Sequence, residues 1–433
     1  MTAIITKNIR MDAQKAYYDA LRNGSEPTYF FFGKSSPWNE EDQIDTSITD
    51  NTVLELTKGS DIILAKRLNA NDIMPCAKRV DWKQGEVYNQ YDMELNMNYV
   101  EKHYVLTDEF NVYKCLSNNN GGPSLEKPTG TGFIPFETTD GYKWKFLYTI
   151  SIRDAKTFLT SKLMPCSFYP GAITTQYKTQ ATAIPGTIDS FKIIDSGKGY
   201  TIASIEIIGD GTDAKCVPVL SGGRIVSVKV VNRGKNYTWA NLVIKGNGTG
   251  ADIKPQVSPL YGHGYNIPKE ICASYLMMAA QVGNEDNQDQ WNNLPKSFAF
   301  RKIGIIKNIT RNDTTNVVDE LVNFCYKLKI ESSTGLETGQ NITFNNGATA
   351  TITALSQQND DTFLYLTELD KSVNTDELSS FTVTGTSTSK IIESVEFSPE
   401  LNYHTIQLLY LETLPEFIRN EENVDLIRFA IEF

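Results

Sequence analysis

The sequence predicts a mainly β protein of the α+β type, with a β-sandwich-like core domain, N-terminal helices and two inserted small all-β modules. Three observations predict this class. Short alternating apolar runs separated by Gly, Pro and Asn turns fill most of the chain after residue 99. A tandem repeat consists of strand patterns only, and helical periodicity is strongest near the N-terminus. With 433 residues, the chain is long enough for about two to four domains.

The N-terminal part predicts two helices around a strand. Apolar residues recur every three or four positions from Ile9 to Leu21, and Gly24 follows as a helix stop. The run TYFFF at Thr28–Phe32 predicts a buried strand. A second helix is predicted over about 50–68, weakened by Gly59. The apolar residues of its shared face are Val53, Leu56, Ile63, Leu64 and Leu68.

A strand and a short helix are predicted in succession from Tyr142. Alternation over 142–150 places Trp144, Phe146 and Tyr148 on one face of the strand and Lys143 and Lys145 on the other.

The helix that follows is marked by its cap. Ser151 is followed three residues later by Asp154, which predicts an N-cap with an acidic N3 residue. We expect this helix to run through Phe158.

The clearest internal signal is a tandem repeat with an offset of 37 residues, in which 188–218 matches 225–255. Each copy contains a strand, a Gly-Lys-x-Tyr-Thr turn, a strand, a Gly-x-Gly-Thr turn and a strand. Glycine suits such turns because it adopts positive φ without steric cost. One copy cannot bury its apolar face alone, whereas two stacked copies can. The sequence therefore predicts a small all-β module over about 186–257.

Later segments are also rich in strand patterns. The run over 271–282 is compatible with a strand or a short helix. Residues 328–395 are rich in Thr, Ser and Asn and contain short β patterns, which predict a second small insertion. Strands are expected at 404–411 and 426–433, the last of them tied into a sheet.

These patterns predict a discontinuous core domain. Its parts and the insertions are expected at 1–170 (N-terminal part of the core), 171–258 (inserted repeat module), 259–327 (continuation of the core), 328–394 (second β insertion) and 395–433 (C-terminal strands completing the core).

Composition excludes several functional classes. The net charge of −11 argues against a general nucleic-acid binder, which needs a basic surface to displace counterions from phosphates. No run of about 18 apolar residues exists to cross a membrane. The N-terminus lacks the apolar segment of a secretory signal, so we expect none.

No constellation predicts catalysis, a cofactor or a metal. The six cysteines are far apart and form no Cys-x-x-Cys pair, so free buried thiols are expected. The three histidines are isolated, and His263 lies in a Tyr-Gly-His-Gly run that predicts a structural turn. Gly33-Lys-Ser35 resembles the end of a phosphate-binding loop, but Thr28 stands where that motif requires glycine.

Acidic residues are expected to be solvated loop charges. Asp210 and Asp213 could ligate calcium, but the matching repeat positions are Asn247 and Gly250, so a turn role is favoured. We therefore assign no catalytic, cofactor-binding or metal-binding residue and expect no small-molecule substrate.

Six blocks occur in an order that resembles a known family. They are YFFFGKSSPW (29–38), RVDW (79–82), VYKCL (112–116), DGYKWKFLY (140–148), LYLETLP (409–415) and the acidic, apolar end at 421–433. Together they resemble the baseplate wedge subunit of T-even-like contractile-tailed phages, the gene-eight product family. The resemblance covers about 1–165 and 395–433, and 259–310 more loosely. The repeat module and 328–395 depart from it.

The resemblance implies a non-enzymatic structural role in the virion tail baseplate, for a protein made in the host cytoplasm. Subunits of this family dimerise and touch neighbouring wedge proteins during assembly and sheath contraction. No nucleic acid or membrane partner is implied. Pro37 and Trp38 are expected to fix the exit of the first strand, where core packing and an interface role are both open. The interface candidates are Pro37, Trp38, Trp82, Trp144 and Tyr410.

An alternative of another class is a tail-associated carbohydrate-binding or polysaccharide-degrading protein. Its support is the β-rich repeats together with Tyr, Asn and Asp residues, which suit sugar stacking and hydrogen bonding. Against it, two repeats of 37 residues are too few for a long β-helical spike.

Overall fold

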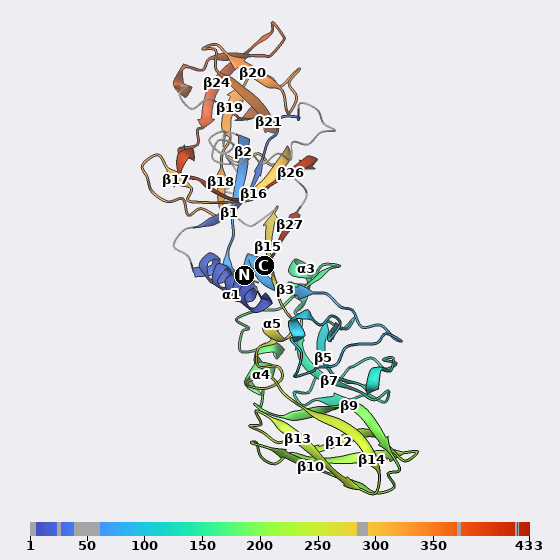
Figure 1. Ribbon diagram of the computed structural model, residues 1–433. Helices are drawn as coiled ribbons and strands as arrows, with labels where there is room; N and C mark the ends of the chain where they lie inside the picture. Colours follow the sequence, from blue (N-terminus) through green and yellow to red (C-terminus); the bar gives the residue numbers. More distant parts are fainter. Residues whose placement is uncertain are drawn as a thin grey trace, which may run out of the picture. The chain divides into compact units, whose positions relative to one another are not determined.

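The computed structural model describes residues 6–23, 27–38, 61–283, 293–369, 374–420, 422 and 424–433. The chain forms two compact units. Unit 1 comprises 1–18, 74–277 and 430–433, and unit 2 comprises 19–73 and 278–429. The predicted fold class is confirmed, because strands dominate both units and helices are few and short after the first (Figure 1).

The N-terminal helix prediction is confirmed by α1 (Lys7–Asn23). Its buried side carries Met11, Gln14 and Tyr18. The Gln14 amide donates a hydrogen bond to the Tyr275 carbonyl oxygen (2.6 Å), which ties the part of α1 up to Tyr18 to the rest of unit 1.

Unit 1 is organised around an antiparallel four-stranded sheet. Its order is β4 (Tyr104–Leu106), β5 (Asn111–Asn118), β7 (Tyr142–Thr149) and β6 (Phe136–Glu137). The predicted alternation holds for Trp144 and Phe146, which pack in one cluster. It is wrong for Tyr148, which packs with Leu147 in another cluster. The β5–β7 register shifts just before this point, and such an irregularity interrupts the period of two.

Short helices and strands complete this part of unit 1. The predicted cap is confirmed, since the Ser151 hydroxyl accepts a hydrogen bond from the Asp154 amide (3.0 Å) at the start of α3 (Ile152–Phe158). The 271–282 run forms mostly β15 (Tyr275–Val282), which belongs to unit 1 up to Met277 and to unit 2 from Met278. The remaining elements are β3 (Ile73–Lys78), which pairs with β8 (Leu163–Pro165), α4 (Thr175–Ala181) and α5 (Ile267–Glu270).

The repeat module exchanges strands between its two copies. Its strands are β9 (Ile188–Lys198), β10 (Ala203–Gly209), β11 (Lys215–Ser221), β12 (Arg224–Asn232), β13 (Ala240–Gly246) and β14 (Thr249–Val257). The pairs are β9–β14, β10–β13 and β11–β12, so each pair joins one strand from each copy. The two copies share one apolar cluster, as predicted, but they are intertwined rather than stacked as separate units.

Reciprocal tyrosine–glycine contacts lock the two copies together. The Tyr200 ring of the first copy covers Gly248 of the second, where a Cβ atom would lie 2.3 Å from the ring. The Tyr237 ring of the second copy covers Gly211 of the first in the same way, at 2.4 Å. Both copies therefore have the same spacing between tyrosine and glycine, and the tyrosine of each copy packs on the glycine of the other.

We expect Gly248→Ala to lower the free energy of unfolding by about 1–3 kcal/mol, because the added methyl group displaces the Tyr200 ring. Urea titration followed by circular dichroism measures this. Gly171→Ala is the matched control, since Gly171 has open space around it and no positive φ. If both substitutions changed the free energy of unfolding equally, the contact between Tyr200 and Gly248 would not stabilise the module.

Unit 2 contains a five-stranded sheet with the most buried strand at its centre. The order is β18 (Leu321–Asn323), β2 (Ile62–Arg67), β1 (Thr28–Gly33), β16 (Phe298–Lys307) and β26 (Gln407–Arg419). Every residue of β1 is buried, which confirms the predicted TYFFF strand. The closing strand predicted at 426–433 is confirmed by β27 (Asp425–Glu432).

The prediction of a helix over 50–68 is wrong for the part of this range that the structure describes. Residues 50–60 lie outside the described residues, and Ile62–Arg67 forms strand β2. This strand lies between β1 and β18. Because both of its faces are covered, its apolar run does not alternate, and such a run cannot be distinguished from a buried helix by periodicity.

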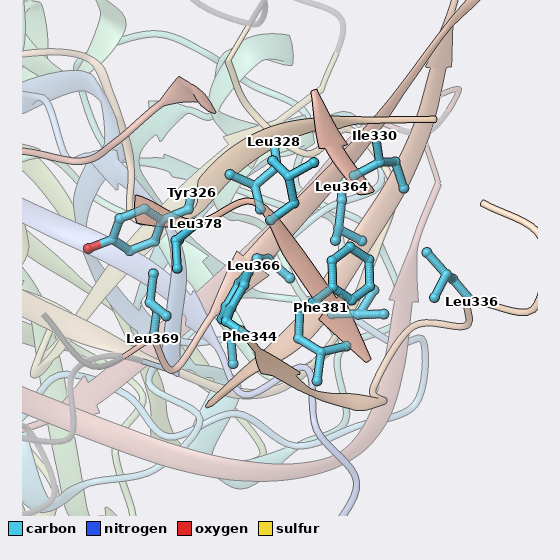
Figure 2. Packing of buried hydrophobic residues seen from close by; sticks show 14 residues of the cluster. Tyr326, Leu328, Ile330, Leu336, Phe344, Leu364, Leu366, Leu369, Leu378 and Phe381 are labelled. Atoms are coloured by element: carbon cyan, nitrogen blue, oxygen red, sulfur yellow. The ribbon is translucent and has the colours of Figure 1, made fainter. Parts of the chain in front are cut away.

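A small closed barrel occupies the Thr- and Ser-rich region of unit 2. Its strands, in barrel order, are β19 (Tyr326–Ile330), β22 (Asp361–Thr367), β21 (Thr349–Gln358), β20 (Asn341–Phe344), β23 (Ser380–Val383) and β24 (Ser389–Phe397). Figure 2 shows its interior, where Leu328, Leu364, Leu366 and Phe381 face one another. A closed barrel leaves no unpaired sheet edge, so this module has its own core.

Candidate functional site

Two of the sequence-predicted interface residues lie at the exit of β1. The Trp38 indole nitrogen donates a hydrogen bond to the Leu414 carbonyl oxygen (3.1 Å), and the Lys34 ammonium lies 4.8 Å from its ring centroid. Pro37 is exposed and lies beside Gly339 of the barrel region. Both residues therefore pack within unit 2, as expected of residues that fix the strand exit, and both keep exposed surface.

The other three candidates differ in exposure. Trp82 is half-buried, and its indole nitrogen donates to the Ser124 hydroxyl (3.1 Å). Tyr410 on β26 is half-buried and donates its hydroxyl to Glu412. Trp144 is completely buried and stacks on Tyr142, with ring centroids 5.4 Å apart. Trp144 is therefore a core residue that cannot itself contact a partner in this structure.

The strand that carries Tyr410 presents a surface that sequence reasoning missed. β26 pairs with β16 and is the terminal strand of its sheet among the described strands. Phe417 and Ile418 on this strand are 50% and 65% exposed, and Leu409 is also exposed. We call Leu409, Phe417 and Ile418 the β26 surface. Exposed apolar side chains on an edge strand favour association with another chain. The signal in the sequence was an apolar pair directly after Pro415-Glu416.

A buried ionic cluster is the main polar feature of unit 1. The Lys114 ammonium on β5 lies 2.7 Å from a Glu270 carboxylate oxygen, and the two side chains are 1% and 7% exposed. The ammonium also lies 3.2 Å from Nδ1 of His263 and 4.5 Å from the Tyr91 ring centroid. The other Glu270 oxygen accepts a hydrogen bond from the Gly264 amide (2.7 Å). The cluster thus ties β5, α5 and the 261–265 turn together.

The pKa values follow from this environment. Burial lowers the pKa of His263 to about 4, and the Lys114 charge acts in the same direction. Burial alone would raise the pKa of Glu270, but the Lys114 ammonium and the hydrogen bonds lower it to about 2. Glu270 is therefore ionised and His263 neutral at pH 7. A carboxylate this acidic does not donate a proton near neutral pH, so the cluster suits a structural tie better than general acid catalysis.

A second ion pair, between buried Asp189 and half-buried Arg233, joins the repeat copies. The Arg233 guanidinium binds both oxygens of Asp189, one of them at 2.9 Å, and Thr187 also bonds Asp189. Nearby Lys145 is buried and donates to the Phe133 carbonyl oxygen. Burial, reinforced by the Arg233 charge, lowers the pKa of Lys145 to about 8.

The turn predictions can be compared with the structure directly. The Tyr261–Tyr265 segment is a turn, as predicted, and His263 within it is completely buried. The Asp210 carboxylate accepts hydrogen bonds from the Thr238 and Trp239 amides (2.9 and 3.2 Å).

The matching residue of the other copy, Asn247, accepts in the same way from the Thr201 and Ile202 amides. The shared role confirms that Asp210 serves a turn.

The remaining motifs are engaged in packing. Ser35 of the Gly-Lys-Ser run lies within hydrogen-bonding distance of Thr353 and Thr367. All six cysteines are free thiols, and all but the half-buried Cys272 are buried. Among the described residues, no group of three or more His, Cys, Asp or Glu could hold a metal ion. No described helix has the length and apolar character needed to span a bilayer.

Comparison with models of protein families finds no match for this chain, and no curated protein matches it significantly. The resemblance to baseplate wedge subunits is therefore carried by the six blocks of this sequence alone.

Proposed function

We propose that this protein is a structural component of a contractile phage tail baseplate. It acts there as a wedge subunit that dimerises and bridges neighbouring wedge proteins during assembly and the conformational change on infection. The sequence blocks support this role, and the mainly β architecture suits a rigid scaffold. One observation carries the proposal: the β26 surface lies in and next to the block LYLETLP, so a block of the resemblance coincides with exposed apolar surface.

The chemistry of the surface favours association over other roles. Phe417 stacks on Phe300, with ring centroids 5.8 Å apart, so its exposed ring is held in place before a partner arrives. A preorganised apolar anchor loses little conformational entropy on binding. In a two-fold dimer the same patch meets itself, and an edge strand can pair with its own copy in that geometry.

The absolute mass of the purified protein, measured by light scattering after size-exclusion chromatography, tests the proposal. We expect a dimer that Phe417→Asp converts to a monomer, because an ionised carboxylate would be buried in the interface. Ile202→Asp is the matched control, since Ile202 is an exposed apolar residue of the repeat module. A trimer would contradict the wedge assignment and favour a fibre or spike. A monomer that also fails to assemble with other baseplate proteins would contradict it as well.

Trp38 provides a separate prediction. We expect Trp38→Ala to destabilise the β1 exit by about 1–2 kcal/mol, since it removes the hydrogen bond to Leu414 and the contact with Lys34. We also expect weaker assembly with neighbouring proteins, measured by co-purification. A variant that folds and assembles like the wild type would exclude an interface role for Trp38.

A further inference from the structure

Unit 1 contains two adjoining cavities of about 370 and 430 Å³. They share Asn8, Tyr265, Asn266 and Lys269, so together they form one elongated groove. Residues of α1, α4, α5, the 259–265 turn and the 95–98 segment line it. We call it the tyrosine groove, because Tyr91, Tyr177, Tyr261 and Tyr265 line its length.

The tyrosines on its rim are exposed. Tyr261 and Tyr265 are 52% and 45% exposed, and their ring centroids lie 4.7 Å apart. Tyr261 has a φ of 70°, a left-handed conformation that is costly for a bulky residue. Leu95 and Leu260 add exposed apolar surface to the same groove. Several large, mainly apolar side chains are therefore exposed to solvent along the tyrosine groove, which is typical of a binding surface.

Hydrogen-bonding groups accompany these rings. The Asn98 amide bonds the Asn8 side-chain oxygen (2.7 Å), which orients both carboxamides. Within the described part of the chain, the Tyr261 and Tyr265 hydroxyls and the Lys269 ammonium have no protein partner. These donors and acceptors remain available to a ligand.

The bottom of the groove is polar but electrically balanced. Lys114 and Glu270 both line it, and they neutralise each other in the 2.7 Å ion pair. The Tyr91 ring beside them donates its hydroxyl to the Val257 carbonyl oxygen (3.0 Å), so this surface is already rigid. Along the rest of the groove Lys15 and Lys269 stand against Asp12, so the lining as a whole carries a net charge of only +1. A nearly balanced lining with a rigid bottom favours an uncharged ligand over a polyanion.

We propose that the tyrosine groove binds a neutral saccharide chain. A pyranose ring presents a C–H face that packs on tyrosine and a rim of hydroxyl groups that bonds carboxamides and phenols. The two cavities in line accommodate successive sugar units. A peptide that binds by strand addition needs a free strand edge, whereas helices and loops provide all of the groove lining except Lys114 of β5. This binding does not rest on the proposed wedge function.

The groove holds the saccharide without cleaving it. Glycoside hydrolysis needs a carboxylic acid that donates a proton to the leaving oxygen and a second carboxylate across the bond. Glu270 is held ionised by Lys114 and lines one cavity only, and Asp12, the other carboxylate along the groove, lines only the second cavity, so no observation places the two across one glycosidic bond. The structure thus supports the binding part of the carbohydrate alternative and not its hydrolytic part.

Isothermal titration of the full chain with three hexasaccharides, of β-1,4-glucose, α-1,4-glucose and β-1,4-N-acetylglucosamine, tests this. We expect at least one to bind with a Kd below about 1 mM, corresponding to about 4 kcal/mol of binding free energy. Tyr265→Ala should raise that Kd at least tenfold, since Tyr265 lines both cavities. Trp239→Ala is the matched control, because Trp239 is a similarly exposed aromatic residue of the repeat module. It should leave the Kd within twofold.

Three outcomes would overturn the proposal. The first is that no hexasaccharide binds up to about 10 mM. The second is that one binds with a Kd that Tyr265→Ala does not change, and the third is that the protein releases shortened saccharides. If Tyr265→Ala does not fold, Lys269→Ala replaces it, since Lys269 is exposed and shared by both cavities. The titration needs no other baseplate protein. Its failure is therefore distinguishable from failure of the dimer measurement, which concerns unit 2.

Discussion

Glu270→Gln is expected to destabilise the region around β5 and α5 by about 3–5 kcal/mol, because it leaves the Lys114 ammonium buried without a counter-charge. Hydrogen exchange of the β5 amides measures this locally, which matters in a chain with two units. We expect their exchange to accelerate, while amides of the barrel in unit 2 keep their protection.

Two controls distinguish the effect of an unpaired buried charge from the effect of losing any carboxylate. Glu206→Gln removes one partner of the Lys245–Glu206 pair, whose side chains are 66% and 58% exposed, and should leave exchange unchanged. The double substitution Lys114→Met with Glu270→Leu should recover much of the protection, because it removes both charges together. If Glu270→Gln behaves like Glu206→Gln, the ion pair does not stabilise unit 1.

Stability is expected to fall by about 3 kcal/mol as the pH decreases from 6.5 to 4, because His263 has its pKa lowered from 6.5 to about 4 in the folded state. In this window the unfolded chain binds a proton at His263 that the folded chain does not bind. Since the unfolded state then holds more protons, acidification favours unfolding. Below pH 4.5 the lowered pKa of Glu270 contributes with the same sign.

Urea titrations between pH 6.5 and 5 isolate the histidine contribution. His263→Asn should flatten the pH dependence in this interval, since its amide oxygen can still accept from Lys114 and it does not titrate. His404→Asn is the matched control, because His404 is exposed. An unchanged slope in the His263→Asn variant would contradict the lowered pKa, because it would mean that the folded and unfolded chains bind protons at His263 equally.

Features set by neighbouring residues could be predicted from the sequence. The Ser151 cap needs only a hydroxyl three residues before an amide, and both lie in one turn. The helix α1 follows from its own periodicity. The repeat also revealed that two copies share one apolar core. Each of these depends on residues that are close together in the chain or identical in spacing.

Features that depend on distant partners could not be predicted. Lys114 and Glu270 are 156 residues apart, and no spacing rule links a strand lysine to a glutamate in a later helix. Strand β2 resembled a helix because consecutive residues are buried on both of its faces, and the sequence could not place its neighbours β1 and β18 beside it. The exchange of strands between the copies could not be predicted either. Both copies have the same strand pattern, so the sequence does not show which copy provides the pairing partner of a given strand.

Because of that exchange, a single copy of the repeat could not form these sheets by itself. A chain with a single copy of the repeat would have three strands and no strand within itself to pair with any of them in this arrangement. It could complete the same sheets only by associating with an identical chain, strand for strand. The present module is therefore equivalent to a strand-exchanged homodimer of one copy, with its two subunits joined in a single chain. Tyr200 and Tyr237 each occupy a glycine site of the other copy.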